Sequence, residues 1–301
     1  MIAGQSALGN LGFIHMNKVY LNYDQAQLDA QYDQSTLVPD LSAYQARWAE
    51  RTVAAKKRYR CIERIAYGPH ADEWLDVYRP DAPGPAPVVV FFHGGAWRAQ
   101  QIGTTGNAAE AYAGAGAVFV AVNFSVAPDA DLDVMVGQSS SATAFVARHA
   151  AEWGGDAGRL HVLGHSSGAH LAANVAVTKW DAFALPGDLV KGLAVTSGPY
   201  DLEPVILSKR NTYLHLDRGG VERCTALKHL RGDLPPAIVA WGGKELAEFQ
   251  RQGAEFAQAW EGTTGSVTRL VFDDNNHFDQ YDEIAKSDSH FTLSFRSLMG
   301  L

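Results

Sequence analysis

The sequence predicts an α/β fold, in which a mostly parallel central sheet of roughly eight strands carries helices on both faces. Three observations support this class. Short apolar runs alternate along the chain with segments of helical period. The run 88–92 is apolar at every position, which is typical of a strand covered on both faces. The run 159–163 leads through a glycine-containing turn directly into a helix.

The chain begins with an N-terminal helical region, residues 1–57. Its clearest helix follows Asp40, a predicted N-cap, and places Leu41, Tyr44 and Trp48 on one apolar face. We expect the aromatic residues here to pack into the core rather than to contact a substrate. Strands are then predicted at 61–67, 74–78, 88–92, 117–124, 159–163, 192–196, 236–241 and 267–272, the first two as an antiparallel pair.

Helices are predicted between these strands at 108–113, 136–153 and 169–177, and a closing helix is predicted at 291–299. A further helix after 236–241 has Leu246, Phe249, Phe256 and Trp260 on one face. Residues 201–233 interrupt the alternation, so we expect a lid-like excursion over the strand ends, where α/β sheets bind ligands. No repeat or linker divides the chain. The economical interpretation is a single domain over 1–301.

Composition limits the function classes. The 301 residues are 47% hydrophobic and 19% charged, as in an ordinary globular protein. A net charge of −8 without a basic cluster argues against nucleic acid and a membrane surface as partners, and leaves a small-molecule substrate. Cys61 and Cys224 lack metal-site spacing, which favours reduced thiols. No convincing signal peptide or membrane-spanning run is present, so a cytoplasmic location is predicted; a homodimer is left open.

The turn at 164–168 reads Gly-His-Ser-Ser-Gly and has the pattern G-x-S-x-G. A strand that turns this sharply into a helix holds its central residue, Ser166, in a strained conformation with the hydroxyl projecting. Side chains at Gly164 or Gly168 would collide across the bend. Ser166 is therefore a candidate nucleophile, and it needs a base and an acid.

His277 is the candidate base, because it follows the last predicted strand and lies at the same sheet edge as Ser166. The candidate acid is Glu245, directly after strand 236–241. Glu248 falls in the first turn of the next helix, where the helix dipole explains a carboxylate. Asp201 is the alternative acid, since it also follows a strand.

A serine hydrolase also needs backbone amides that hold the oxyanion. Gly94 and Gly95 follow the buried strand 88–92, and the amide of Ser167 lies at a helix N-terminus, so these three residues are the predicted oxyanion hole. We expect His93 to shape this loop by hydrogen bonding, and Trp97 to form a pocket wall rather than core.

Two other classes stay open. Asp273, Asp274, His277 and Asp279 are crowded enough to suggest a metal hydrolase, but the histidine spacing of such sites is absent and no metal is expected. The second class is a ligand-binding module without activity. Such proteins commonly lose a member of the triad, whereas Ser166, Glu245 and His277 are all present.

These motifs resemble those of the α/β-hydrolase fold, and more closely the kynurenine formamidase (arylformamidase)-like branch with its HGGxW motif. The similar stretches, which together cover nearly the whole chain, are HGGAW at 93–97, SGPYDLEP at 197–204, ELAEFQRQ at 245–252, NHFD at 276–279 and LVPD at 37–40 with Tyr44 and Trp48.

The resemblance implies a cofactor-free serine hydrolase that cleaves an N-formyl amide or a small, aromatic ester through an acyl-enzyme. With Trp97, the expected substrate pocket includes Tyr200 and Phe278. Two positions depart from the well-studied animal members: Ala96 replaces an aromatic residue, and the acid is Glu rather than Asp. A general short-chain carboxylesterase therefore stays open as the alternative.

Overall fold

The computed structural model describes residues 17–82, 84–99 and 102–301. The predicted absence of a signal peptide concerns residues that lie mostly outside these ranges. One sheet runs through the molecule, with strand order β1-β2-β4-β3-β5-β6-β7-β8. The eight strands are β1 (Ile62–Ala66), β2 (Trp74–Tyr78), β3 (Ala86–Phe92), β4 (Val118–Val122), β5 (Gly155–His165), β6 (Val190–Thr196), β7 (Ala237–Gly242) and β8 (Val267–Phe272).

The sheet confirms the predicted fold class. Only the pairs β1–β2 and β2–β4 are antiparallel, and all strands from β4 across to β8 run parallel. Every residue of β3 is buried, as the unbroken apolar run predicts. The carboxyl ends of β3, β5, β6, β7 and β8 therefore meet at one edge, where the loops that follow them can form a site.

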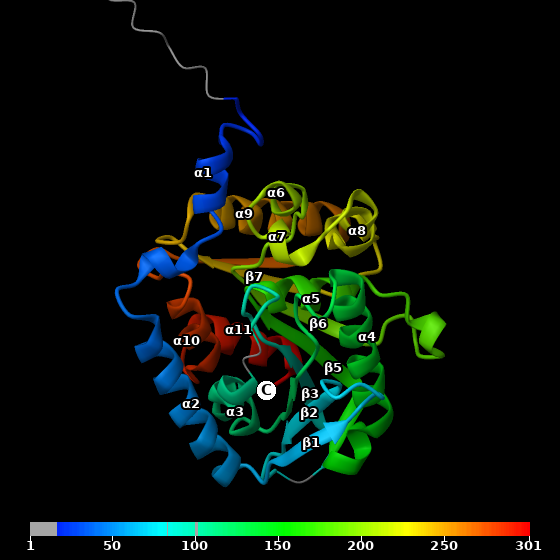
Figure 1. The fold of residues 1–301 in the computed structure, drawn as a ribbon. Helices are drawn as coiled ribbons and strands as arrows, with labels where there is room; N and C mark the ends of the chain where they lie inside the picture. The colour runs from blue at the N-terminus through cyan, green and yellow to red at the C-terminus, as the bar shows by residue number, and fades with distance from the viewer. Residues whose placement is uncertain (1–16, 83, 100–101) are drawn as a thin grey trace, which may run out of the picture.

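Helices cover both faces of this sheet (Figure 1). They are α1 (Gln25–Ala30), α2 (Leu41–Arg58), α3 (Ala109–Ala113), α4 (Leu132–His149), α5 (Ser167–Val177), α6 (Glu203–Leu207), α7 (Asn211–Leu214), α8 (Arg218–Cys224), α9 (Ala247–Thr264), α10 (Asp279–Ala285) and α11 (His290–Met299). Short 3-10 helices lie at Gln34–Leu37, Ile102–Ala108, Ala150–Trp153, Trp180–Phe183 and Ala226–His229.

The core has two layers, one on each face of the sheet. Val88, Val90 and Phe92 of β3 pack with residues of α4, α5 and α9. Val89 and Phe91 point to the other face and pack with residues of α2, α3, α10 and α11. Side chains alternate across a strand, so one fully apolar run serves both layers.

Several boundaries differ from the sequence prediction. Asp40 caps α2 as predicted, accepting from the amides of Ser42 and Ala43. Strand β5 begins at Gly155, which pairs with Ala86 before the register shifts and the regular ladder resumes at Leu160, so its first residues need no apolar pattern. Helix α10 was not predicted, since its sequence DQYDEIA is mostly polar. The excursion at 201–233 consists of α6, α7, α8 and one 3-10 helix.

Candidate active site

Ser166 lies at the sharp turn between β5 and α5. Its backbone angles are φ 56° and ψ −128°, a positive-φ conformation outside the left-handed helical region that costs free energy in a residue with a Cβ. A Cβ added to Gly164 would lie 2.3 Å from the carbonyl oxygen of Gly168. A Cβ added to Gly168 would lie 2.1 Å from the carbonyl oxygen of Phe92. The two glycines therefore permit the turn that the sequence predicts.

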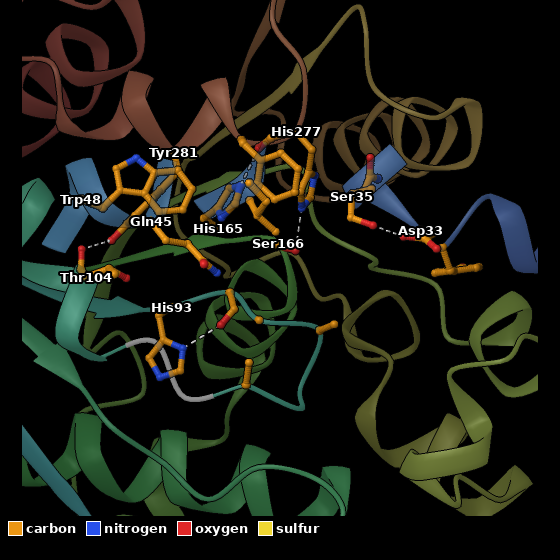
Figure 2. A pocket seen from close by; sticks show the side chains of 18 of the residues that line it. Asp33, Ser35, Gln45, Trp48, His93, Thr104, His165, Ser166, His277 and Tyr281 are labelled. Carbon is orange, nitrogen blue, oxygen red and sulfur yellow. Dashed lines mark hydrogen bonds between the residues drawn. The ribbon is translucent and has the colours of Figure 1, made fainter. Parts of the chain in front are cut away.

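The structure brings the three predicted triad residues together, and Figure 2 shows two of them, Ser166 and His277, side by side. Nε2 of His277 lies 2.9 Å from Oγ of Ser166, and Nδ1 of His277 lies 2.9 Å from Oε2 of Glu245. All three side chains are buried. They come from loops after β5, β7 and β8, whose carboxyl ends share one edge of the sheet.

The hydrogen-bond partners fix the tautomer of His277. An ionised carboxylate only accepts, so Nδ1 carries the proton toward Glu245, and Nε2 is free to accept from the Ser166 hydroxyl. The other oxygen of Glu245, Oε1, accepts from the amide of Gly242 at 2.8 Å and from the hydroxyl of Ser197. Ser197 is held at φ 58°, beyond the end of β6. These two donors direct Oε2 toward the imidazole.

His165 supports the base from the neighbouring position. Its Nε2 lies 3.0 Å from the carbonyl oxygen of His277, and its ring stacks on Tyr281. Burial, and then the nearby His277, lower the pKa of His165 to about 3, so the ring is neutral and donates from Nε2. The partner of the Ser166 hydroxyl is His277 and not the adjacent His165.

The loop after β3 packs against the serine turn. A Cβ on Gly94 would lie 3.0 Å from Cβ of Ser166, so this backbone passes very close to the candidate nucleophile. Gly95 has φ 119°, and a Cβ there would meet the carbonyl oxygen of Ala99 at 2.4 Å. Within the described ranges, the amides of Gly94, Gly95 and Ser167 donate to no acceptor outside the helix and strand ladders.

Two residues of this loop have left-handed backbones, Ala96 at φ 56° and Trp97 at φ 58°. Nε1 of Trp97 donates to Nδ1 of His170 at 3.2 Å, and burial lowers the pKa of His170 to about 4, which keeps that nitrogen unprotonated. Nδ1 of His93 lies 2.7 Å from the carbonyl oxygen of Gly94. His93 thus contacts the loop as expected.

A cavity of about 310 Å³ opens onto Ser166 and His277. Figure 2 shows Trp48, Tyr281 and His165 to one side of Ser166, and Asp33 and Ser35 to the other. The remaining wall residues come from the N-terminal segment, the segment after β3, the excursion and the loop after β8: Tyr32, Gln34, Leu41, Gln45, His93, Gly94, Gly95, Ala96, Ala99, Thr104, Arg210 and Phe278.

The pocket prediction needs correction at two of its three residues. Phe278 lines the cavity. Trp97 does not, because its ring is turned into the core against His170. Tyr200 does not either, because its ring stacks on Phe256 with centroids 4.0 Å apart. Both residues are at most 1% exposed, so they belong to the core that packs beneath the site.

The aromatic residues of the N-terminal region also differ from the prediction. Trp48 is buried, with its Nε1 bonded to Asp282 at 2.9 Å, yet it lines the cavity as well. Tyr32 is likewise both buried and in contact with the cavity. Core packing and contact with the cavity are not exclusive here, because the segment that covers the cavity also closes one side of the core. The high density of aromatic residues in this region was the feature of the sequence that could have indicated a contact with the cavity.

The alternative acids lie away from His277. Asp201 accepts from the hydroxyl of Tyr20 at 3.0 Å. Glu248 is buried and pairs with Arg251 at 2.6 Å. An ion pair therefore stabilises this carboxylate in addition to the helix dipole that the sequence suggests. Glu245 is thus the carboxylate on the imidazole.

The crowded acidic loop does not form a metal cluster. Asp274 pairs with Lys244 at 2.8 Å, and Asp279 accepts from the hydroxyl of Tyr44 at 2.8 Å. In the described part of the chain, no group of three or more histidine, cysteine or carboxylate side chains is arranged to hold a metal ion. Nor is any described helix both long and apolar enough to cross a bilayer.

Comparison with known proteins identifies the family. A family model described as BD-FAE matches residues 75–193. The kynurenine formamidase of Danio rerio is 28% identical over 286 residues, which cover 91% of this chain and 96% of that protein. The kynurenine formamidase of Salmo salar is 30% identical over 263 residues, covering 83% of this chain and 86% of that protein. The chain belongs to the kynurenine formamidase family.

Solved structures support the fold of this family. A structure from a Silicibacter species, described as a thioesterase, superposes with a TM-score of 0.77 at 22% identity and covers 89% of this chain and 98% of that one. An esterase of Pyrobaculum calidifontis superposes with a TM-score of 0.68 at 18% identity, covering 89% and 97%. The fold is that of the α/β hydrolases, and the protein is a hydrolase of amide or ester bonds.

Proposed function

We propose that this family member is a serine hydrolase in which Ser166 is the nucleophile, His277 the base and Glu245 the acid. The observation that carries the proposal is the pair of 2.9 Å contacts that joins Ser166 to His277 and His277 to Glu245. An activated serine needs this relay, because its hydroxyl is a weak nucleophile at neutral pH.

The reaction proceeds in two halves. Oγ of Ser166 attacks the substrate carbonyl while its proton moves to Nε2 of His277, and the amides of Gly94 or Gly95 and of Ser167 stabilise the oxyanion. His277 then gives that proton to the leaving amine or alcohol, leaving an acyl-serine. Water repeats the sequence and releases the acid. Glu245 stabilises the imidazolium in both halves.

We further propose that the substrate is a small aromatic N-formyl amide. A cavity of about 310 Å³ accommodates one aromatic ring and a short acyl group. Trp48, Tyr281 and Phe278 supply aromatic wall surface for such a ring. Two relatives, which match 91% and 83% of the chain, are kynurenine formamidases.

A general short-chain carboxylesterase is the second candidate. It is supported by the carboxylesterase NlhH of Mycobacterium tuberculosis, which is 38% identical over 104 residues, 34% of this chain. Rates on N-formyl-kynurenine, other formanilides and p-nitrophenyl acetate and butyrate, measured side by side, separate the two candidates. A kcat/KM for formanilides below that for the esters would favour the esterase.

The Ser166→Ala variant is the blank of this panel and tests the nucleophile. We expect kcat to fall by about 10⁴-fold or more. Turnover close to that of the wild type would remove Ser166 from the mechanism. Labelling by a fluorophosphonate probe supplies a second readout, and failure of the folded protein to react would favour a ligand-binding module without activity.

We also propose that the whole chain, with the N-terminal region and the excursion, is a single domain that acts in the cytoplasm. The contact between Gln25 and the carbonyl of Leu207 joins the N-terminal region to the excursion. Cys61 and Cys224 are both free thiols, which suits a reducing compartment. A homodimer would cover the exposed Val271 on the edge strand β8, and light scattering tests it.

A further inference from the structure

The loop after β3 carries the proposed oxyanion donors in an unusual backbone conformation. Gly95, Ala96 and Trp97 follow one another with φ values of 119°, 56° and 58°. Glycine adopts a positive φ readily, but in a residue with a Cβ this conformation costs free energy. Two of the three residues are not glycine, so the loop keeps its shape only where contacts from outside hold it. Those contacts decide where the amides of Gly94 and Gly95 point.

The first of these contacts comes from the excursion at 201–233. The hydroxyl of Tyr213, in α7, donates to the carbonyl oxygen of Ala96 at 3.1 Å. The guanidinium of Arg98, two residues further along the loop, lies over the ring of Tyr213 at 5.2 Å from its centroid. A cation over an aromatic face is attracted to it. Tyr213 therefore holds the loop at two points, with its hydroxyl and with its ring.

The second contact reaches the same excursion through α5. Nε1 of Trp97 donates to Nδ1 of His170, as described above. The opposite ring nitrogen, Nε2, donates to the carbonyl oxygen of Cys224 at 2.8 Å, where α8 ends. Nδ2 of Asn174, one turn further along α5, donates to the same carbonyl at 2.9 Å. A single buried imidazole thus connects the indole of Trp97 to the excursion.

Tyr213 contacts the loop from a separate cavity. This adjoining cavity, of about 580 Å³, is lined by Tyr213, Arg98 and Ala96 among others. Ala96 also lines the cavity that opens onto Ser166, whereas Tyr213 is not among the described residues of that wall. A change confined to the Tyr213 hydroxyl can therefore move the loop without removing a wall of the cavity in which the substrate reacts.

We propose that the excursion positions the oxyanion hole, with Tyr213 as the residue that holds the loop after β3 in its strained conformation. The inference rests on the proposed function, because it concerns the amides that stabilise the oxyanion there. A misplaced amide matters little while the substrate carbonyl is neutral, and most when its oxygen becomes negative. Tyr213 touches the loop and not the reacting atoms, so it is a positioning residue.

Tyr213→Phe tests the hydroxyl alone, because it keeps the ring beneath Arg98. We expect kcat to fall about tenfold with KM within about twofold, since a full 1 Å displacement costs about 100-fold and the ring still restrains the loop. Tyr67→Phe is the matched control. The Tyr67 hydroxyl donates to the backbone carbonyl of Asn123 at 2.8 Å, and Tyr67 is not among the described residues that line either cavity. Its kcat should stay within about twofold of the wild type.

An inhibitor that forms an oxyanion supplies a readout that a general structural defect would not move. Oγ of Ser166 adds to the carbonyl carbon of phenyl trifluoromethyl ketone, the hydroxyl proton passes to Nε2 of His277, and the ketone oxygen becomes negative. The inhibition constant should rise about tenfold in Tyr213→Phe, in step with the loss of kcat. Phenyl methyl ketone lacks the fluorines that activate the carbonyl, and its inhibition constant should stay within about twofold.

A smaller perturbation covers the case in which Tyr213→Phe does not fold. Arg98→Gln removes only the contact with the Tyr213 ring, at an exposed side chain. We expect it to lower kcat and the affinity for the trifluoromethyl ketone by the same factor, about threefold, the value of one exposed cation–π contact. In that case Arg98→Gln decides, and wild-type kcat for it would overturn the proposal.

Two results for Tyr213→Phe would overturn the positioning role while leaving the proposed function intact. One is a wild-type kcat with wild-type affinity for the trifluoromethyl ketone, and the other is a rise in KM alone, which would make Tyr213 a substrate contact. Failure of the proposed function is a different result. In that case Ser166→Ala retains turnover, or the wild type binds the trifluoromethyl ketone no more tightly than the methyl ketone, and the oxyanion hole is refuted together with the nucleophile.

Discussion

Replacing Gly168 with alanine should damage both stability and activity, although alanine is the better helix former. The added Cβ would lie 2.1 Å from the carbonyl oxygen of Phe92 and 2.4 Å from that of His93. Both contacts are with backbone, so no side-chain rotation relieves them. Overpacking of this kind costs about 3 kcal/mol, and the gain in helix propensity returns about 1 kcal/mol. We expect a net loss of about 2 kcal/mol in the free energy of unfolding.

Gly137→Ala is the matched control. Gly137 lies on the exposed side of α4, and an added Cβ meets nothing within 4 Å. The same substitution there should raise the free energy of unfolding by about 1 kcal/mol. Urea unfolding followed by circular dichroism gives both values, and the two variants should differ by about 3 kcal/mol.

The activity of Gly168→Ala tests how the two loops are connected. Phe92 and His93 lead into Gly94 and Gly95, so moving their carbonyls displaces the proposed oxyanion donors. A displacement near 1 Å lowers kcat about 100-fold. Wild-type stability of Gly168→Ala would refute the close packing of the turn. Lower stability with an unchanged kcat would refute the coupling between the turn and the loop after β3.

Three further predictions concern the same site. Glu245→Gln should lower kcat about 10³-fold, because it disturbs the tautomer of His277. Ser197→Ala removes one of the two donors to Oε1 of Glu245 and should lower kcat less than about tenfold. Equal losses of steady-state rate for both variants would contradict this ranking. The free energy of unfolding of Ser166→Gly should exceed that of Ser166→Ala by about 1 kcal/mol, because glycine relieves the positive φ. Equal urea midpoints for the two variants would show that the turn is unstrained. Stability should be full above about pH 6.5 and fall as pH drops toward about 4. Burial lowers the pKa of His170, His93 and His161 to about 4 and that of His165 to about 3, so the unfolded chain takes up these protons first. Each of these histidines contributes up to about 1.4 kcal/mol per pH unit to the slope. Urea midpoints at pH 7.5, 6.5 and 5.5 measure this slope. His170→Asn should reduce the slope, whereas the control His149→Asn, at an exposed position, should leave it unchanged.

The parts of the site that follow strands could be predicted from the sequence. Ser166, Glu245 and His277 each lie a few residues after the end of a predicted strand, and parallel strands bring their carboxyl ends to one edge. Position relative to a strand is a local property that periodicity reveals. The order of the motifs along the chain then pairs the residues without any knowledge of distances.

The cavity wall could not be predicted in the same way. Whether the rings of Trp97 and Tyr200 point into the cavity or the core depends on partners such as His170 and Phe256, which are distant in sequence. Arg210 was missed for a different reason: an arginine in a polar segment is normally exposed, and only the assembled fold removes it from water. Contacts between distant segments leave no local pattern.

The separation of the triad from the N-terminal part of the wall has a consequence for how this enzyme can change. The reacting groups are held by the sheet, while Tyr32, Gln34 and Trp48 belong to an N-terminal segment that precedes it. Substitutions in that segment alter the shape and polarity of the cavity without moving the Ser166–His277 contact. Selection for a new substrate can therefore act on one part of the gene while the chemistry is conserved in another, and libraries restricted to residues 32–48 are the direct way to retarget the enzyme.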